Sequence, residues 1–269
     1  FKFFAGEALR NLGDAVASVR PGVDVMMERE AVGIIGLITP WNFPIAIPAW
    51  KIAPALAFGN AVVMKPAELT PACAWELAKV LDEAGCPRGV FNLVLGAGSV
   101  VGARIAEHPD IDAVSFTGSV PTGRQIGVTC ASLGKKVQME MGGKNPMVVM
   151  DDADLDVAIG ACVNGAFFST GQRCTASSRL IVTKGIYDKF VDALTEAADN
   201  LVVGDALDSA TQIGPVVDEK QLQQNVDYVK LAAEEGCDVR GGAIQNGPGF
   251  FQKPAVFASA TNDMRVSRE

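Results

Sequence analysis

The sequence predicts an α/β protein: a mostly parallel sheet covered by helices on both sides, followed by a second α/β unit. Two observations lead to this prediction. Short apolar or β-branched runs alternate with helix-like segments along the first half of the chain. The composition, 49% hydrophobic and 20% charged over 269 residues, is globular and allows two modest domains, which excludes disordered and collagen-like chains.

Several runs in the first half are typical of strands, at residues 32–39, 60–65, 90–95, 112–117 and 135–140. The clearest helix between them begins after Pro71 and ends before Gly85, with its apolar residues on one face. Sheets of this kind bind nucleotides beyond the carboxyl ends of their strands. We therefore look for functional residues where the strands end.

Residues 31–50 contain no charged side chain and are long enough to span a membrane. Pro40, Pro44 and Pro48 interrupt this segment, and an interior proline costs a helix roughly 3 kcal/mol. We therefore expect a buried strand, then a loop and a short helix, and no membrane span.

The second half is expected to form another α/β unit, with a domain boundary near the Gly142–Gly143 pair, so that the domains are residues 1–141 and 142–269. Its predicted elements are a strand at 145–150, a helix at 154–168, a strand near 179–183 and a helix that begins near Tyr187. Residues 15–30 predict a hairpin that turns at Pro21 and Gly22. It is either an edge hairpin of the first domain or a strand pair that joins subunits.

The formal net charge is −8, from 31 acidic and 23 basic residues without long runs of either sign, which argues against a nucleic-acid surface. The 6 cysteines form no CxxC motif, which argues against a disulfide framework or a zinc cluster. We expect a reducing, cytoplasmic setting and no bound metal. With His108 as the single histidine, chemistry that needs a histidine beside the nucleophile is disfavoured.

A glycine-rich segment from Gly118 to Gly123 follows the strand-like run 112–117 and opens a helix. Arg124 stands where a P-loop requires lysine, so an ATPase is excluded. Free N–H groups and the helix dipole at Ser119 favour a phosphate there. An ordinary strand-to-helix turn explains the same residues equally well.

Lys65 and Glu68 stand at the end of another strand-like run. Such a pair can hydrogen-bond ribose hydroxyls, and the carboxylate would repel a 2′-phosphate, but a surface ion pair is an equal alternative. Further along, Gly96, Gly98 and Gly102 miss the dinucleotide fingerprint GxGxxG by one residue.

Asn42 lies between Pro40 and Pro44 just past a strand, and a stiff loop could hold its amide toward a developing oxyanion. Alternatively, the amide satisfies local backbone groups. Glu140 ends a strand among apolar neighbours, which raise the pKa of a carboxyl group and suit a general base. Alternatively, it pairs with Lys144.

Cys174 alone among the cysteines lies in a polar, glycine-containing loop beside a cation, Arg173, which favours the reactive thiolate. The remaining thiols are expected in the core or in ordinary surface positions. They are Cys73, Cys86, Cys130, Cys162 and Cys237. A Cys-His protease dyad is not available to this chain.

Taken together in this order, the motifs resemble those of the aldehyde dehydrogenase superfamily. They are PWNFP, KPAE, FTGS with its GxxxxG, EMGGKNP and GQRC. The resemblance covers essentially the whole chain, and the ordered set from Pro40 to Cys174 makes it specific. Within the family, VRPGVD, GKKVQMEMGGKNP and FFSTGQRCTASSRLIV are most similar to bacterial 2-oxoglutarate semialdehyde (2,5-dioxopentanoate) dehydrogenases.

The resemblance implies a fold, truncated at both ends. Residues 1–141 would be a Rossmann-like cofactor-binding domain whose hairpin at 15–30 serves oligomerisation, and residues 142–269 an α/β catalytic domain. It further implies a cytoplasmic homodimer or homotetramer that acts on a small aldehyde, with no nucleic acid or membrane as partner. As given, the chain is expected to be the central portion of such an enzyme.

The resemblance also implies roles. Cys174 would be the nucleophile, Asn42 and the Cys174 N–H the oxyanion hole, and Glu140 the base that activates water, through a thiohemiacetal and a thioester. Arg173 either attracts a carboxylated aldehyde or faces a structural carboxylate. Glu68 favours NAD, with NADP as the alternative. The implied cofactor residues are Thr39, Trp41, Lys65, Glu68, Gly98, Gly118, Ser119 and Gly123.

Three alternatives to oxidation of 2-oxoglutarate semialdehyde stay open at this point. The substrate could be another semialdehyde, such as succinic semialdehyde. The enzyme could be a CoA-acylating relative, although Glu140 would then have no water to activate. The chain could also be a non-catalytic fragment that retains the fold, although it keeps Cys174, Glu140 and Asn42 together.

Overall fold

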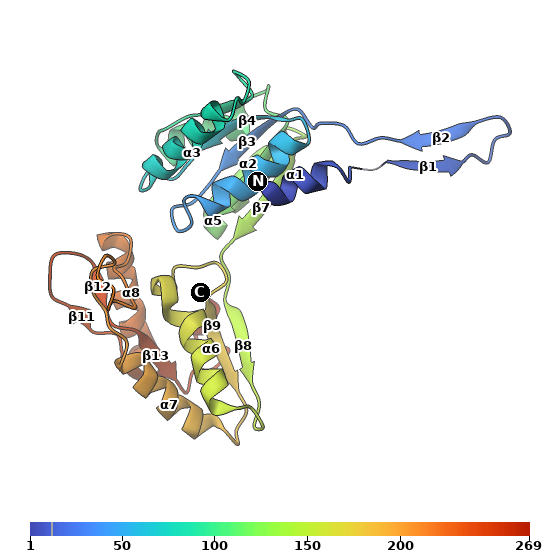
Figure 1. Cartoon of the computed structure of the whole chain (residues 1–269). Coiled ribbons are helices and arrows are strands. Elements are labelled where there is room, and N and C mark those ends of the chain that lie inside the picture. Colours follow the sequence, from blue (N-terminus) through green and yellow to red (C-terminus); the bar gives the residue numbers. More distant parts are fainter. Residues whose placement is uncertain (12) are drawn as a thin grey trace. The chain divides into compact units, whose positions relative to one another are not determined.

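The structure is a computed structural model and describes residues 1–11 and 13–269. The chain forms two compact units, unit 1 (Phe1–Met141) and unit 2 (Gly142–Glu269), which are described in turn (Figure 1). Within the described residues, every helix is too short or too polar to cross a membrane.

Unit 1 is built on a five-stranded, fully parallel sheet in the order β5-β4-β3-β6-β7. Its strands are β3 (Ile34–Ile38), β4 (Ala61–Lys65), β5 (Phe91–Leu93), β6 (Ala113–Gly118) and β7 (Lys136–Met141). The chain runs outward from β3 to β5 and returns to β6 on the other side of β3. The strand order therefore reverses between β3 and β6, and in doubly wound sheets ligands bind outside the carboxyl ends at this reversal.

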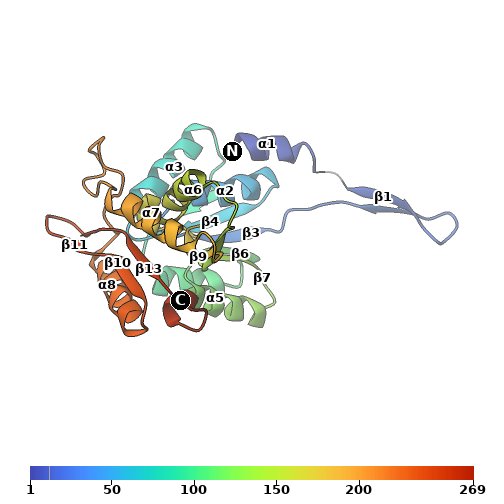
Figure 2. The same ribbon diagram turned by 90° about the horizontal axis from the view of Figure 1, so that it is seen from below.

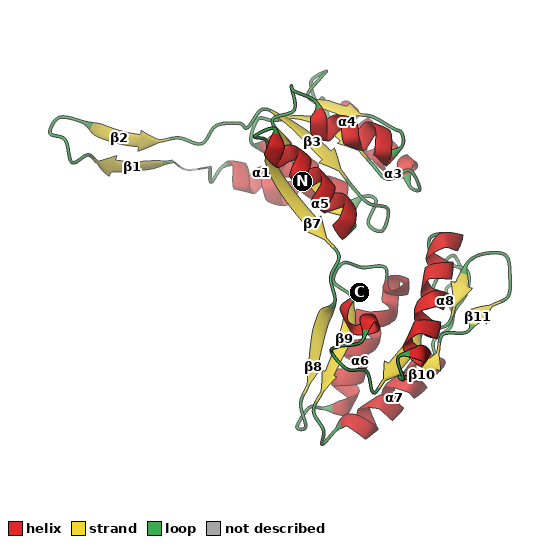
Figure 3. Cartoon of the chain, turned by 180° about the vertical axis from the view of Figure 1, so that it is seen from behind, coloured by secondary structure: helices red, strands yellow, loops and turns green. Residues whose placement is uncertain are grey.

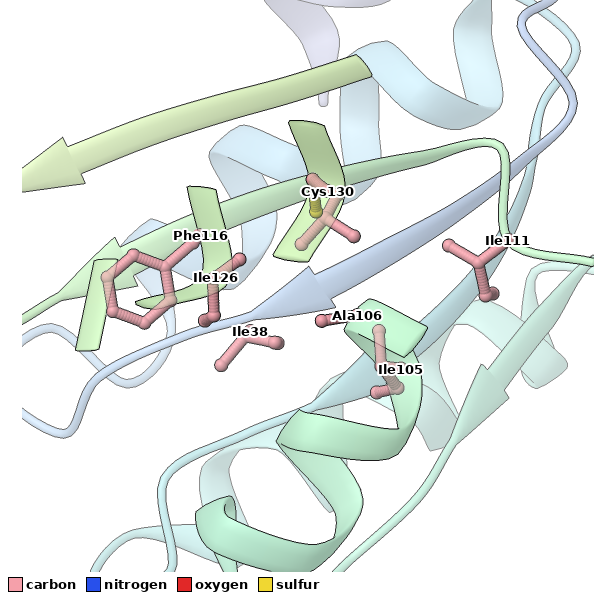
Figure 4. Packing of buried hydrophobic residues seen from close by; sticks show 8 residues of the cluster. Ile38, Ile105, Ala106, Ile111, Phe116, Ile126 and Cys130 are labelled. Carbon is pink, nitrogen blue, oxygen red and sulfur yellow. The ribbon is translucent and has the colours of Figure 1, made fainter. Parts of the chain in front are cut away.

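Helices cover both faces of this sheet, as the sequence predicts. Leu37 and Ile38 are neighbours in β3 and point to opposite faces, since side chains alternate along a strand. On the Leu37 face lie α2 (Ala46–Ala57) and α3 (Pro71–Glu83). On the Ile38 face lie a helical turn, η1 (Gly98–Gly102), α4 (Ala103–Glu107) and α5 (Val120–Ser132). Figure 4 shows this second core, where Ile105 and Ile126 meet the strand residues Ile38 and Phe116.

The uncharged segment 31–50 forms the predicted buried strand and loop, and a helix follows them. The helix, α2, is longer than expected, at 12 residues. Pro48 lies in its first turn, where a missing N–H costs nothing because the turn has no intrahelical acceptor for it. The prolines therefore delay the start of the helix to Ala46 and do not limit its length.

The predicted hairpin is confirmed. Following α1 (Lys2–Ala8), β1 (Asp14–Ala17) pairs antiparallel with β2 (Asp24–Met27), and Gly22 in the turn has φ 76°. The two strands form a sheet of their own, with every residue exposed, and extend away from the rest of unit 1 (Figure 1, Figure 2). The hairpin is therefore not an edge of the five-stranded sheet.

Unit 2 opens with the parallel pair β8 (Asn145–Val149) and β9 (Ser177–Val182). Two helices, α6 (Leu155–Phe167) and α7 (Tyr187–Asp199), follow these strands (Figure 3). They pack on the pair through buried side chains such as Cys162 and Phe190. The Asp154 carboxylate caps α6 by accepting a hydrogen bond from the Val157 N–H at 3.0 Å.

The rest of unit 2 consists of one long helix, α8, and several short elements, none of which the sequence analysis anticipated. They are η2 (Phe168–Gly171), α8 (Glu219–Glu234), β10 (Asp238–Gly241), β11 (Ile244–Gln245), β12 (Phe251–Gln252), β13 (Ala255–Ala258) and α9 (Arg265–Arg268). Strand β10 pairs antiparallel with β13, and β11 with β12.

Candidate active site

Thr39 lies at the carboxyl end of β3, beside the reversal of strand order. Its N–H donates a hydrogen bond to the Lys65 carbonyl at 3.2 Å, which extends the pairing of β3 with β4. The residue is only 4% exposed, and its Oγ1 has no hydrogen-bond partner in the described part of the chain. A buried hydroxyl without a partner costs about 1–3 kcal/mol, so this position fits a bound polar ligand.

Lys65 and Glu68 form the ion pair that the sequence left open, but only Glu68 is at the surface. Lys65 is 5% exposed, at the end of β4, and its Nζ lies 3.5 Å from Glu68 Oε1. The same carboxylate oxygen accepts a hydrogen bond from the Gly98 N–H at 2.6 Å. This hydrogen bond, followed by the Lys65 charge, holds the pKa of Glu68 below its usual range. A buried ammonium and a fixed, half-exposed carboxylate thus lie together at the carboxyl edge of the sheet.

Gly118 and Ser119 lie where β6 ends and α5 begins, again at the reversal of strand order. The Ser119 hydroxyl donates to Thr122 Oγ1 at 2.9 Å. The glycines also have a packing role: a Cβ at Gly118 would lie 2.6 Å from the Phe116 ring, and one at Gly123 would lie 2.4 Å from Met141 Sδ. Close packing of α5 on β7 is therefore one reason for glycine at position 123, whereas at position 118 a side chain would meet a ring of the same strand, β6.

Trp41 and Asn42 lie half-buried in the turn between β3 and α2. The turn is closed by the Ile47 N–H, which donates to the Phe43 carbonyl at 3.1 Å. Pro40 and Pro44 restrict the backbone on either side, as the sequence predicts.

Glu140 does not have the apolar surroundings expected from its neighbours. Side chains alternate along β7, so Met139 and Met141 pack into the core of the Ile38 face while the Glu140 carboxylate is exposed on the opposite face. There it accepts a hydrogen bond from Gln138 Nε2 at 3.0 Å. The prediction of an apolar environment, drawn from adjacent residues, is therefore wrong within unit 1.

The sequence analysis missed the polar side chains that lie next to this carboxylate. Lys51, on α2, donates hydrogen bonds to Ser115 Oγ at 2.6 Å and to Gln138 Oε1 at 3.1 Å. Burial lowers the pKa of Lys51 to about 8, and the charge of Glu140 works in the opposite direction. One signal was available: Lys51 is a single charged residue between long uncharged runs. Such a residue needs a polar partner when it is packed against a sheet.

Lys144, the alternative partner proposed for Glu140, belongs to unit 2 and has contacts of its own there. Lys144 Nζ donates to the Val266 carbonyl at 2.9 Å, so the ammonium has a partner there. Burial, followed by the charge of Arg179, lowers the pKa of Lys144. Arg179 also donates from Nε to the Lys144 carbonyl at 3.0 Å, which fixes the start of β8.

Cys174 is exposed, in the loop between η2 and β9. The turn η2, which precedes this loop, contains three consecutive residues with positive φ: Ser169 at 56°, Thr170 at 58° and Gly171 at 64°. Left-handed backbone at a serine and a threonine is uncommon and must be held by its surroundings. Here the Thr170 hydroxyl donates to the Gly214 carbonyl at 3.1 Å.

Three of the other cysteines are buried: Cys130, Cys162 and Cys237. Burial raises the pKa of each of these thiols, to about 11 for Cys162, which opposes formation of the thiolate. Cys73 and Cys86 are half-buried. Cys174 therefore has the exposure that the sequence predicts for a nucleophile.

Arg173 contacts neutral oxygens. Its Nε donates to Ser169 Oγ at 3.0 Å, and its Nη1 to Asn164 Oδ1 at 3.5 Å. Neither partner is the structural carboxylate considered as an alternative.

The thiol does not line the main cavities formed by the described residues of unit 2. Gly171 and Lys144 line two of them, of about 490 Å³ and 340 Å³, but Cys174 is not among the described residues that line either one. Asn42 and Glu140 belong to unit 1 and Cys174 to unit 2.

Comparison with known proteins gives a single answer for the family. Residues 1–269 match the aldehyde dehydrogenase family. The chain is 43% identical to alpha-ketoglutaric semialdehyde dehydrogenase and 40% identical to betaine aldehyde dehydrogenase, both of Bacillus subtilis (strain 168). Each match covers 100% of this chain and 56% of the relative, so the chain spans about half the length of these proteins.

A solved structure agrees. The NAD+ complex of an aldehyde dehydrogenase from Bacillus cereus superposes with a TM-score of 0.96 at 39% identity, over 100% of this chain and 55% of that one. The match over all residues, together with this shared structure, shows that the chain belongs to the aldehyde dehydrogenase family.

Proposed function

We propose that this chain carries the cofactor-binding and nucleophile-bearing parts of an NAD-dependent enzyme that oxidises 2-oxoglutarate semialdehyde to a carboxylic acid. The observation that carries the proposal is the exposed thiol of Cys174, in the loop after the constrained turn η2, while three other thiols are buried with raised pKa values. In this proposal, unit 1 binds the cofactor and unit 2 is the catalytic domain.

The residues at the carboxyl edge of the sheet suit a dinucleotide. Lys65 and Glu68 would hold ribose hydroxyls, and Gly98 would fix Glu68 through its N–H. Gly118, Ser119 and Gly123 would form the turn that receives phosphate at the start of α5. Trp41 and the Thr39 hydroxyl, which has no hydrogen-bond partner among the described residues, would line the same site, and the Glu68 charge favours NAD over NADP. When bound, the nicotinamide supplies the hydride acceptor that turns a thiohemiacetal into a thioester.

Cys174 would begin the reaction. Its thiolate forms a bond to the aldehyde carbon, and the carbonyl electron pair moves to oxygen. The Asn42 amide and the Cys174 N–H would stabilise this oxyanion. Glu140 would later take a proton from water as the water oxygen attacks the thioester carbon. The carbon–sulfur bond then breaks and releases the carboxylic acid and the Cys174 thiolate.

Which aldehyde the enzyme oxidises is inferred from the proteins to which the chain is similar. Alpha-ketoglutaric semialdehyde dehydrogenase is among the most similar, and betaine aldehyde dehydrogenase is similar at nearly the same identity. Among the described residues of unit 2, Arg173 donates hydrogen bonds to the neutral side chains of Ser169 and Asn164, so its charge is available to a carboxylated aldehyde. We also propose that the exposed hairpin of β1 and β2 joins subunits of a cytoplasmic homo-oligomer.

The test uses the full-length gene product. Formation of NADH at 340 nm is compared for 2-oxoglutarate semialdehyde, succinic semialdehyde and betaine aldehyde, with kcat/KM highest for the first. Cys174→Ala abolishes turnover, whereas Cys86→Ala, at a half-buried thiol, preserves it. Retained activity in Cys174→Ala would contradict the mechanism, and a higher kcat/KM for betaine aldehyde would contradict the substrate.

A further inference from the structure

We propose that Asn145 is a positioning residue for the nucleophile: its side-chain amide clamps the turn that carries Cys174 and thereby holds the Cys174 N–H in place. The inference rests on the proposed role of Cys174 and concerns unit 2 alone. Asn145 Nδ2 donates one hydrogen bond to the Cys174 carbonyl at 2.6 Å and a second to the Ala176 carbonyl at 3.2 Å.

The clamped segment is a β-turn from Arg173 to Ala176. It is closed by the Ala176 N–H, which donates to the Arg173 carbonyl at 3.1 Å. Cys174 is the second residue of the turn, so its carbonyl belongs to the central peptide group. That group is not held by the closing hydrogen bond, and its rotation interconverts turn types. Asn145 supplies the hydrogen bond that prevents this rotation.

The second hydrogen bond fixes the end of the turn. The Ala176 carbonyl accepts from Asn145 and also from the Ser178 N–H at 2.9 Å, which anchors Ala176 to β9. Through its own N–H, Ala176 then holds the Arg173 carbonyl. In a trans peptide this carbonyl and the Cys174 N–H lie in one plane and point in opposite directions. The Cys174 N–H is therefore fixed in direction, and no described residue of unit 2 accepts a hydrogen bond from it.

Asn145 is itself held rigidly. It is the first residue of β8, and Pro146 after it restricts its backbone to extended conformations. The pairing of β8 with β9 shifts register between Asn145 and Pro146, an irregularity of the kind that redirects a side chain beside a functional loop. On the other side, Arg179 holds the Lys144 carbonyl at 3.0 Å, which fixes the peptide group that enters Asn145.

The chemistry of the clamp requires an amide. Both partners are carbonyl oxygens, which only accept, so the side chain must present its NH₂ to them. Asn145→Asp keeps the shape but replaces two donors by an acceptor, while Asn145→Ala removes the clamp without repulsion. Asn92 is a matched control because its Nδ2 also bonds two carbonyls, of Val62 at 3.1 Å and Gly89 at 2.8 Å, in unit 1.

The experiment compares these variants in the full-length enzyme. Asn145→Asp and Asn145→Ala should lower kcat by about 10- to 100-fold, because the oxyanion donor is misplaced, with KM within about two-fold. The rate at which iodoacetamide alkylates Cys174, followed by mass spectrometry of its peptide, should stay within about two-fold of the wild-type rate, since this reaction forms no oxyanion. Asn92→Asp should lower Tm without changing either rate.

The outcomes separate this inference from the proposed function. An unchanged kcat in the Asn145 variants overturns the positioning role. A parallel decrease of kcat, of the alkylation rate and of Tm also overturns it, and so does failure of both variants to fold. Should only Asn145→Asp fail to fold, Asn145→Ala decides. Turnover in Cys174→Ala overturns the proposed function and this inference with it. An inactive Cys174→Ala combined with normal kcat in the Asn145 variants overturns the positioning role alone.

Discussion

Glu68 and Gly98 lie 30 residues apart in sequence, and the Gly98 N–H donates a 2.6 Å hydrogen bond to the Glu68 carboxylate. This bond joins the end of β4 to the turn η1 and fixes a negative charge, supported by the buried Lys65, at the carboxyl edge of the sheet. A fixed charge in that place is what would discriminate between a ribose hydroxyl and a ribose phosphate.

Glu68→Gln should therefore relax the choice of cofactor. The amide oxygen can still accept the Gly98 N–H, so the geometry is kept while the charge is lost. We expect the dissociation constant for NADP+ to fall by about ten-fold and that for NAD+ to change little, measured by calorimetry. Glu83→Gln, at an exposed residue at the end of α3, is the control. Equal NADP+ affinity in variant and wild type would show that Glu68 does not discriminate against NADP+.

Asn42→Ala should remove one donor of the proposed oxyanion hole. Loss of such a donor lowers kcat by about 100- to 1,000-fold, and we expect the same here with a smaller effect on KM. Steady-state kinetics of the full-length enzyme give the result. Asn200→Ala, at the exposed end of α7, controls for loss of an amide. A kcat within a factor of about two of wild type would show that Asn42 contributes nothing to the oxyanion.

Glu140→Gln should separate acylation from deacylation. The replacement keeps an oxygen for the Gln138 amide but cannot take a proton from water. We expect a burst of NADH close to the enzyme concentration, followed by a steady-state rate lowered by about 100-fold or more. Stopped-flow absorbance at 340 nm measures both phases. Glu76→Gln, at an exposed position on α3, should behave as wild type. Normal steady-state turnover in Glu140→Gln is incompatible with a general base there.

Lys51 should make the free energy of unfolding depend on pH in the alkaline range. Its pKa is about 8 in the folded state, against the ordinary 10.5, because burial disfavours the charge. Between these values the unfolded chain binds more protons, so the free energy of unfolding rises with pH. In Lys51→Met this contribution is absent.

The check is urea unfolding of both proteins at neutral pH and near pH 9.5. The free energy of unfolding of wild type, minus that of Lys51→Met, should be larger at the higher pH. Lys79→Met, at an exposed lysine of α3, controls for loss of a lysine as such. A difference that does not change with pH would show that Lys51 is not the group responsible.

Gly36 should resist substitution because α4 lies directly over it. A Cβ at this buried position of β3 would lie 2.3 Å from Ile105 Cγ2, so Gly36→Ala must displace the helix. We expect a loss of about 1–3 kcal/mol in the free energy of unfolding. Gly160→Ala, in α6 with no atom near the added methyl, should instead stabilise by about 0.5–1 kcal/mol. Equal effects at the two positions would contradict this account of packing.

Much of the fold could be predicted because its signals are local. The strands and helices of unit 1 follow from runs of apolar and β-branched residues with a helical or strand period, and a few neighbouring residues suffice to define such a period. The exposure of Cys174 follows similarly from the polar residues beside it. Glu140 shows the limit of prediction from neighbouring residues, since its apolar neighbours in sequence lie on the opposite face of β7.

The sequence by itself thus determined the type of the main elements from β1 to α7, the family resemblance and the identity of the candidate nucleophile. Only the tertiary structure decided the strand order, with its reversal between β3 and β6, and the partners of the polar groups. Gly98 meets Glu68, and Asn145 meets Cys174, across 30 and 29 residues of chain. Local propensity carries no information about such partners, because they are chosen by how strands align and helices pack once the core has formed.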